Sequence, residues 1–77
     1  MSKHQVTYSG VVISLERDER GEYLVFAYGE VNGKEGYFYI KLKNSELERV
    51  LRLGLGQRVE GRGFITSENP LLVHECV

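Results

Sequence analysis

The Asn32-Gly33 pair constrains the fold of this chain most strongly, because it predicts where one strand ends and its partner begins. Both central residues of a two-residue type I′ hairpin turn need a positive φ, and Asn-Gly is the preferred pair for that turn. Val31 then pairs with Lys34, and the register of the two strands follows from this rung. We therefore expect a hairpin formed by residues 22–31 and 34–42.

The predicted register sorts the side chains of this hairpin into two unlike sets, since successive side chains of a strand point to opposite faces. One set is aromatic in its middle and consists of the pairs Tyr28–Tyr37 and Phe26–Tyr39. The other set is apolar and includes the pairs Ala27–Phe38 and Val25–Ile40. A single small domain has one core, so we expect one set to be buried and the other to face solvent.

Two observations favour burial of the apolar set. Three buried tyrosines on neighbouring rungs would each need a hydrogen-bond partner inside a small core. The aromatic set also continues into Glu30, Glu35 and Lys41, which are side chains that prefer water. The opposite arrangement, with the rings buried for their large apolar area, remains an alternative. An odd-length loop with a bulge would split the four rings between the two faces.

Length and charge limit the possible functions. The 77 residues form one domain, residues 1–77, with little chain left for accessory parts. Ten basic and eleven acidic residues give a net charge of −1, so overall charge indicates no attraction to nucleic acid or to an anionic membrane. Local clusters of one sign are still compatible with this balance.

The amino terminus and the single cysteine indicate the cellular compartment. Cys76 cannot form an internal disulfide, which suits a reducing compartment. The first residues contain no apolar signal region, and no stretch approaches the roughly 20 apolar residues of a membrane span. We expect a cytoplasmic protein without a membrane partner.

The remaining elements follow from short local patterns. A β-branched segment, residues 6–15, predicts a first strand that is bent or bulged at Gly10. Residues 45–48 match a capping box with Ser45 as the N-cap, which predicts a short helix that ends at Gly54. Residues 56–65 and 71–77 predict two further strands joined by a turn at 66–70. The predicted order is β-β-β-α-β-β.

This order resembles the OB-fold, a five-stranded Greek-key barrel with a helix between its third and fourth strands. The resemblance covers nearly the whole chain and includes the stretches Val6-Thr7-Tyr8-Ser9-Gly10-Val11-Val12 and Leu55-Gly56-Gln57-Arg58-Val59-Glu60-Gly61. It implies an all-β fold and a binding site on the outer face of strands two and three, between the loops at 17–21 and 66–70. An SH3-like barrel or an unrelated α+β sheet would also accommodate the order.

Two binding functions fit the aromatic set. Flat rings along two neighbouring strands can stack single-stranded DNA or RNA bases without strong sequence preference. The residues expected to bind nucleic acid are the four rings and the nearest basic side chains: Phe26, Tyr28, Tyr37, Tyr39, Lys41, Arg20, Lys34 and Arg62. The alternative is a protein interface on the same face, as a homodimer or in a larger complex, because exposed aromatics are typical of such interfaces.

Catalytic and metal-binding functions are not expected. His74 and Cys76 share one face of a strand, and His4 could join them, but structural zinc needs four closely spaced ligands. No set of nucleophile, base and orienting acid can be assembled, and no glycine-rich phosphate loop is present. We expect a non-catalytic module without a cofactor or metal.

Overall fold

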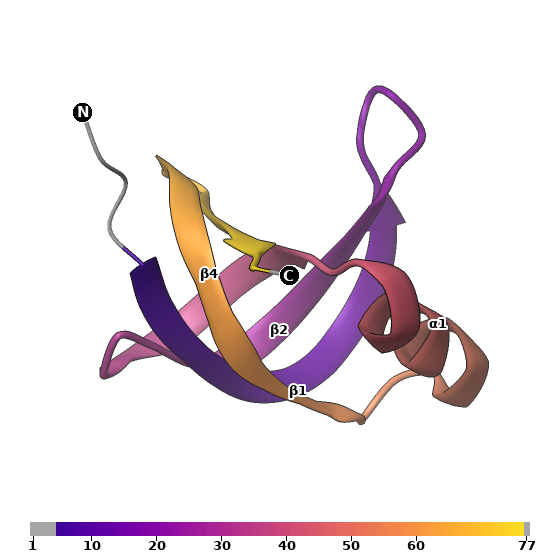
Figure 1. Ribbon diagram of the computed structural model, residues 1–77, viewed down its shortest axis with the longest axis horizontal. Helices are drawn as coiled ribbons and strands as arrows, with labels where there is room; N and C mark the ends of the chain where they lie inside the picture. Colours follow the sequence, from indigo (N-terminus) through magenta and orange to yellow (C-terminus); the bar gives the residue numbers. More distant parts are fainter. Residues whose placement is uncertain (1–4, 77) are drawn as a thin grey trace.

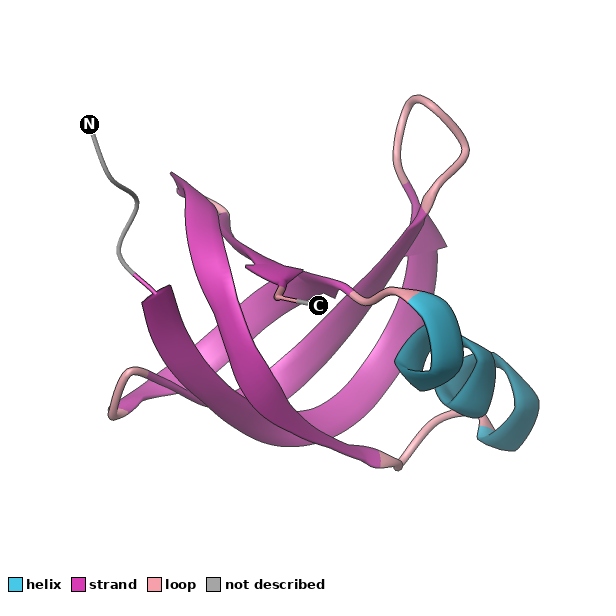
Figure 2. Cartoon of the chain, viewed as in Figure 1, coloured by secondary structure: helices cyan, strands magenta, loops and turns pink. Residues whose placement is uncertain are grey.

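The computed structural model describes residues 5–76 of the chain. It contains five strands and one helix, in the predicted order β-β-β-α-β-β (Figures 1 and 2). The elements are β1 (Gln5–Arg17), β2 (Tyr23–Val31), β3 (Lys34–Lys41), α1 (Asn44–Leu53), β4 (Arg58–Glu68) and β5 (Leu71–Glu75). Within the described residues, no helix is long and apolar enough to cross a membrane.

The five strands close into a barrel with the spatial order β1-β2-β3-β5-β4. The long strand β1 curves so that its partners are β2 on one side and β4 on the other. A short parallel pairing of β3 with β5 completes the barrel. Figure 1 shows α1 at one end of the barrel and the β2–β3 turn at the other. The expected all-β barrel is confirmed, and its architecture is compatible with an OB-like fold.

The β2–β3 hairpin has the predicted register. Val31 pairs with Lys34 across a two-residue turn, Tyr28 pairs with Tyr37, and Phe26 pairs with Tyr39. Asn32 and Gly33 have φ values of 54° and 86°, which are the positive angles that a type I′ turn requires. The alternative with a bulged, odd-length loop is therefore wrong.

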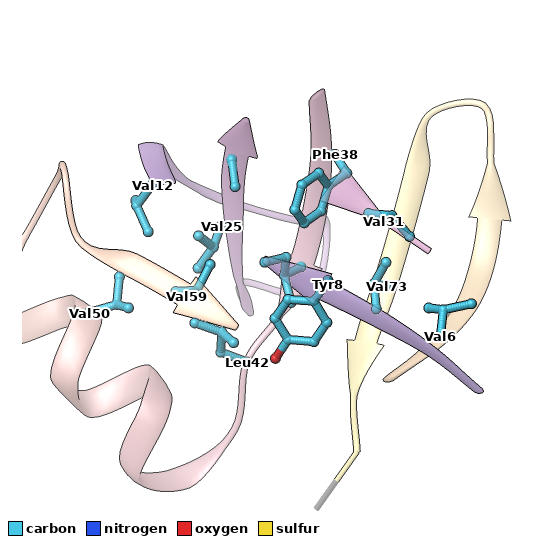
Figure 3. Close-up of a cluster of buried hydrophobic side chains, with 12 residues drawn as sticks. Val6, Tyr8, Val12, Val25, Val31, Phe38, Leu42, Val50, Val59 and Val73 are labelled. Carbon is cyan, nitrogen blue, oxygen red and sulfur yellow. The ribbon is translucent and has the colours of Figure 1, made fainter. Parts of the chain in front are cut away.

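The apolar set of the hairpin lies in the core, as predicted. Val25, Ala27, Phe38 and Ile40 are buried among side chains from every strand and from α1 (Figure 3). The other members of this core are Val6, Tyr8, Val12, Val31, Leu42, Val50, Val59 and Val73. The side-chain alternation of the hairpin therefore leaves the aromatic set on the outside of the barrel.

The bulge in β1 lies at Ile13 and not at Gly10, so its predicted position is wrong. The register with β2 shifts between Val12 and Ser14. Gly10 instead lies where β2 approaches closely, because a Cβ atom there would be 2.7 Å from the Tyr28 carbonyl oxygen. Glycine at this position therefore permits the close contact between β1 and β2.

The predicted capping box does not form. The helix begins at Asn44, which places Ser45 inside the first turn, and no side chain caps the amino end. The backbone N–H of Lys43 instead donates to Glu75 Oε1 of β5 at 2.7 Å. The residue before the helix is therefore held by a side chain of β5 and not by a capping side chain of the helix itself. The helix ends just before Gly54, as predicted, but Gly54 has a φ of 86° and a ψ of −157°, so the predicted left-handed cap does not form.

The fourth and fifth strands differ from their predicted bounds. β4 begins at Arg58 because the chain turns around 54–57, where the Gly56 N–H donates to the Val12 carbonyl oxygen. A register shift between Ile65 and Ser67 lets β4 continue to Glu68, so the connection to β5 is shorter than the predicted turn at 66–70. β5 ends at Glu75, and residue 77 lies outside the described part of the chain.

Candidate functional site: an aromatic face on β2 and β3

The rings of Phe26, Tyr28, Tyr37 and Tyr39, here called the aromatic face, contact one another in an unbroken cluster. Phe26 and Tyr37 stack nearly parallel, with ring centroids 5.4 Å apart and an interplanar angle of 6°. Tyr39 lies at a tilt against Phe26 at 4.9 Å, and Tyr28 meets Tyr37 edge-on at 4.8 Å. These distances are typical of favourable aromatic pairs, so the rings support one another's orientation.

The rings are unequally exposed. Tyr37 is 61% exposed and Tyr28 is 39% exposed, whereas Phe26 and Tyr39 are partly covered by their neighbours. The end of the face near the turn is therefore the most open to a flat ligand, and Phe26 lies between the rings of Tyr37 and Tyr39.

Two aliphatic side chains of β1 extend this surface, and the sequence analysis did not identify them. Val11 pairs with Tyr28 and is 38% exposed, and Ile13 is 40% exposed. Alternation after Val12 places Ile13 outside, and the bulge explains why Ser14 faces outward as well. Val12 is buried and Leu15 packs against the core, so the extra residue places both Ile13 and Ser14 between them on the outside. A correct prediction of the bulge position would have shown this.

Carboxylates hold two of the tyrosine hydroxyls. The Tyr39 hydroxyl donates to Glu16 Oε1 at 3.3 Å, and burial together with this carboxylate raises the pKa of Tyr39. The Glu35 carboxylate accepts a hydrogen bond from Tyr28 and raises the pKa of that hydroxyl. The rim of the aromatic face is therefore acidic as well as basic, and Glu16 is a site residue that the sequence analysis missed.

Lys41 reaches the face but is held by two acids of the β1–β2 loop. Its Nζ lies 2.8 Å from Asp18 Oδ2 and 3.0 Å from Glu22 Oε1, and these contacts raise its pKa. Asp18 also accepts hydrogen bonds from the backbone N–H groups of Arg20 and Glu22. Lys41 thus fastens this loop to β3, and its charge is already balanced by carboxylates.

The other three predicted basic contacts are scattered. Lys34 begins β3 beside the hairpin turn, and Arg20 lies in the β1–β2 loop. Both are exposed and form no ion pair with another residue in the range 5–76. Arg62 lies on β4, which pairs with β1 and β5 and not with β2 or β3. It lines a different cleft with Thr7 and Glu30, so the structure does not group it with the rings.

The residues considered for a metal site form no cluster. Cys76 is a free thiol that accepts a hydrogen bond from Gln5 Nε2 at 3.3 Å, and His74 lies half-buried on β5. His4 lies outside the described residues. Among those that are described, no group of three or more His, Cys, Asp and Glu side chains could hold a metal ion.

Comparison of the chain with protein-family models, with curated proteins and with solved structures found no match.

Proposed function

We propose that this protein is a non-catalytic module that binds single-stranded nucleic acid through the aromatic face. The observation that carries the proposal is the contiguous cluster of four rings on the outside of a barrel. Every base has a flat π-face, and stacking one base on an aromatic side chain contributes about 1–3 kcal/mol by alanine substitution. Membership of the OB-fold superfamily, which binds oligonucleotides on this face, is part of the same proposal.

The electrostatics of the rim predict how this binding depends on salt. Of the four predicted basic contacts, all within residues 5–76, Lys41 is paired with two carboxylates and Arg62 lies in a different cleft, which leaves Lys34 and Arg20 as unpaired cations near the two ends of the face. Binding to a single strand weakens with salt with a slope of about −0.7 per phosphate contact on a log–log scale. Two contacts predict a slope of about −1.4, so stacking contributes more to affinity than charge does.

A titration of the purified protein tests the proposal. Fluorescence anisotropy with a labelled oligothymidylate of about ten nucleotides, a length within the range of OB-fold sites, should show saturable binding at low salt. The duplex of the same length should bind more weakly, because its bases are already stacked. Absence of any binding to the single strand at low salt would reject the function.

A pair of variants checks that the face is responsible. Tyr37→Ala removes the most exposed ring and should weaken binding by about tenfold. Leu55→Ala removes an equally exposed apolar side chain outside the face and should leave the affinity unchanged. Equal losses in both variants would show that the contact lies elsewhere.

A second candidate function is self-association through the same face. The exposed aliphatic side chains Val11 and Ile13 beside Tyr28 favour it, because they add apolar surface that stacking of bases does not require. The near-zero net charge imposes little repulsion between two copies. Light scattering over a concentration series should then detect a dimer that Val11→Lys dissociates, and a monomer at all concentrations would reject this candidate.

A further inference from the structure

One end of the aromatic face is hollowed into a cleft of about 250 Å³. Its lining combines the Tyr39 ring with apolar side chains and a single carboxylate, and it consists of Glu16, Leu24, Tyr39, Ser67, Pro70 and Leu72. Tyr39 and Leu72 lie directly opposite each other on paired strands, and Glu16 pairs with Leu24 on the other side. With Ser67 on β4, all five strands contribute to the lining of the cleft.

The carboxylate at the edge of this cleft is oriented by two hydroxyl groups. Ser14 Oγ donates to Glu16 Oε2 at 3.2 Å, and the Tyr39 hydroxyl donates to Oε1 at 3.3 Å. Each oxygen of a carboxylate can accept about two hydrogen bonds, so each retains one free acceptor position. The bulge contributes to this arrangement, because it places Ser14 on the outside next to Glu16.

A carboxylate with one free position on each oxygen matches a pair of neighbouring donors. Guanine carries such a pair, N1–H and the N2 amino group, on its Watson–Crick edge. Adenine and cytosine each place an acceptor nitrogen beside their amino group, and thymine and uracil flank their single N–H with carbonyl oxygens. Bases in single strands are read on this edge while they stack on aromatic side chains.

From this geometry we propose that the cleft is a guanine-selective subsite, in which Glu16 accepts both edge donors while the base packs against the Tyr39 ring. The inference rests on the proposed function and adds a sequence preference to it. The lining contains no basic side chain, so the cleft suits a base and not a phosphate group. An arginine side chain of a protein is the alternative occupant, because its guanidinium can pair with the carboxylate and stack on the ring.

The test compares oligothymidylates of about ten nucleotides that differ at one central position, measured by competition in fluorescence anisotropy. Guanine at that position should increase the affinity at least about fivefold over thymine, the lower end of the range for one bidentate base contact. Adenine and cytosine should not. Inosine, which lacks only the N2 amino group, should lose most of the gain.

Three variants locate the effect. Glu16→Gln replaces one acceptor by a donor and should abolish the guanine preference while binding to oligothymidylate persists. Tyr39→Phe keeps the ring but removes the hydroxyl that orients Glu16, so it should reduce the guanine preference. Glu19→Gln makes the same change of charge at an exposed residue of the β1–β2 loop and should behave like the wild type. Thermal unfolding of each variant verifies that it is folded.

The outcomes separate this inference from the proposed function. Binding to oligothymidylate with equal affinity for all four central bases would overturn the guanine subsite and leave the proposed function standing. A guanine preference that survives Glu16→Gln would also overturn it. No binding to any oligonucleotide, together with Glu16-dependent binding of an arginine-containing peptide, would overturn both and assign the cleft to a protein partner.

Discussion

The two faces of the β2–β3 hairpin share one backbone and one register but have opposite roles. The inner face consists of Val25, Ala27, Phe38 and Ile40, which are almost completely buried, whereas the outer face presents four rings to solvent. Since alternation along a strand assigns residues to each face in turn, a single register error would exchange the core and the site. The contrast teaches that the buried face provides the stability of this barrel, while the rings of the proposed binding face contribute little to the core.

The largest expected effect follows from truncating the inner face. Phe38 is only 2% exposed, so Phe38→Ala should reduce the free energy of unfolding by about 3–5 kcal/mol through the cavity that it leaves. Tyr37→Ala, at the preceding residue of the same strand, should reduce the free energy of unfolding by less than about 1 kcal/mol because its ring is largely in solvent. Urea unfolding of both variants measures the difference. Similar losses would mean that the outer face also contributes to the core.

For the affinity for oligonucleotides, we expect substitutions on the outer face to have the larger effect and those on the inner face to have none. Phe26→Leu removes the ring that contacts both Tyr37 and Tyr39, so it should weaken oligonucleotide binding by about 1–2 kcal/mol. Ile40→Val on the inner face should reduce stability by about 0.5–1.5 kcal/mol and leave the affinity unchanged. Anisotropy titrations and urea unfolding of the two proteins provide the measurement. A loss of affinity in the Ile40 variant would break the proposed separation of roles.

The turn that joins the strands should affect both faces through stability alone. Gly33 has a φ of 86°, and an alanine in the left-handed region costs about 1–2 kcal/mol. Gly33→Ala should therefore lower the free energy of unfolding by that amount, while the folded protein retains its affinity. Gly33→Asn serves as the control, because asparagine tolerates a positive φ and should cost less. A change in affinity would show that the turn itself contacts the ligand.

The smallest effect is expected at the loop beside the aromatic face. The hydrogen bond from Lys41 lowers the pKa of Asp18, so the folded state favours the ionised carboxylate. This contribution is present above the usual aspartate pKa of about 3.9 and is lost as pH falls through the lowered value. Asp18→Asn should therefore reduce stability at neutral pH but not in strong acid. Urea unfolding at both pH values, with Glu19→Gln as the charge-matched control, tests this.

Local patterns in the chain were sufficient to predict the hairpin and the division of its side chains. Asn32 and Gly33 define the turn, and the alternation of apolar and aromatic residues identifies the inner and outer faces. Both signals act between residues that are close in sequence. The order of the five strands could also be predicted, because each strand is bounded by its own turn residues.

The tertiary structure determined the features that depend on contacts between distant segments. The bulge lies at Ile13, and Gly10 instead lies where the close approach of β2 leaves no room for a Cβ atom. The backbone N–H of Lys43, just before the helix, donates to the Glu75 side-chain carboxylate on β5, a contact that no local pattern contains. Pairing with acids of the β1–β2 loop changes Lys41 from an expected free cation into an anchor.

The sequence by itself therefore determined the four rings of the aromatic face, and the tertiary structure determined the chemistry of the rim. Ring positions follow from the register of one hairpin, which is a local property. The carboxylate of Glu16 reaches Tyr39 only because a bulge in β1 turns it outward and the pairing of β1, β2 and β3 brings the two residues together. Such an arrangement depends on the register of three paired strands, which the pattern of one segment does not contain.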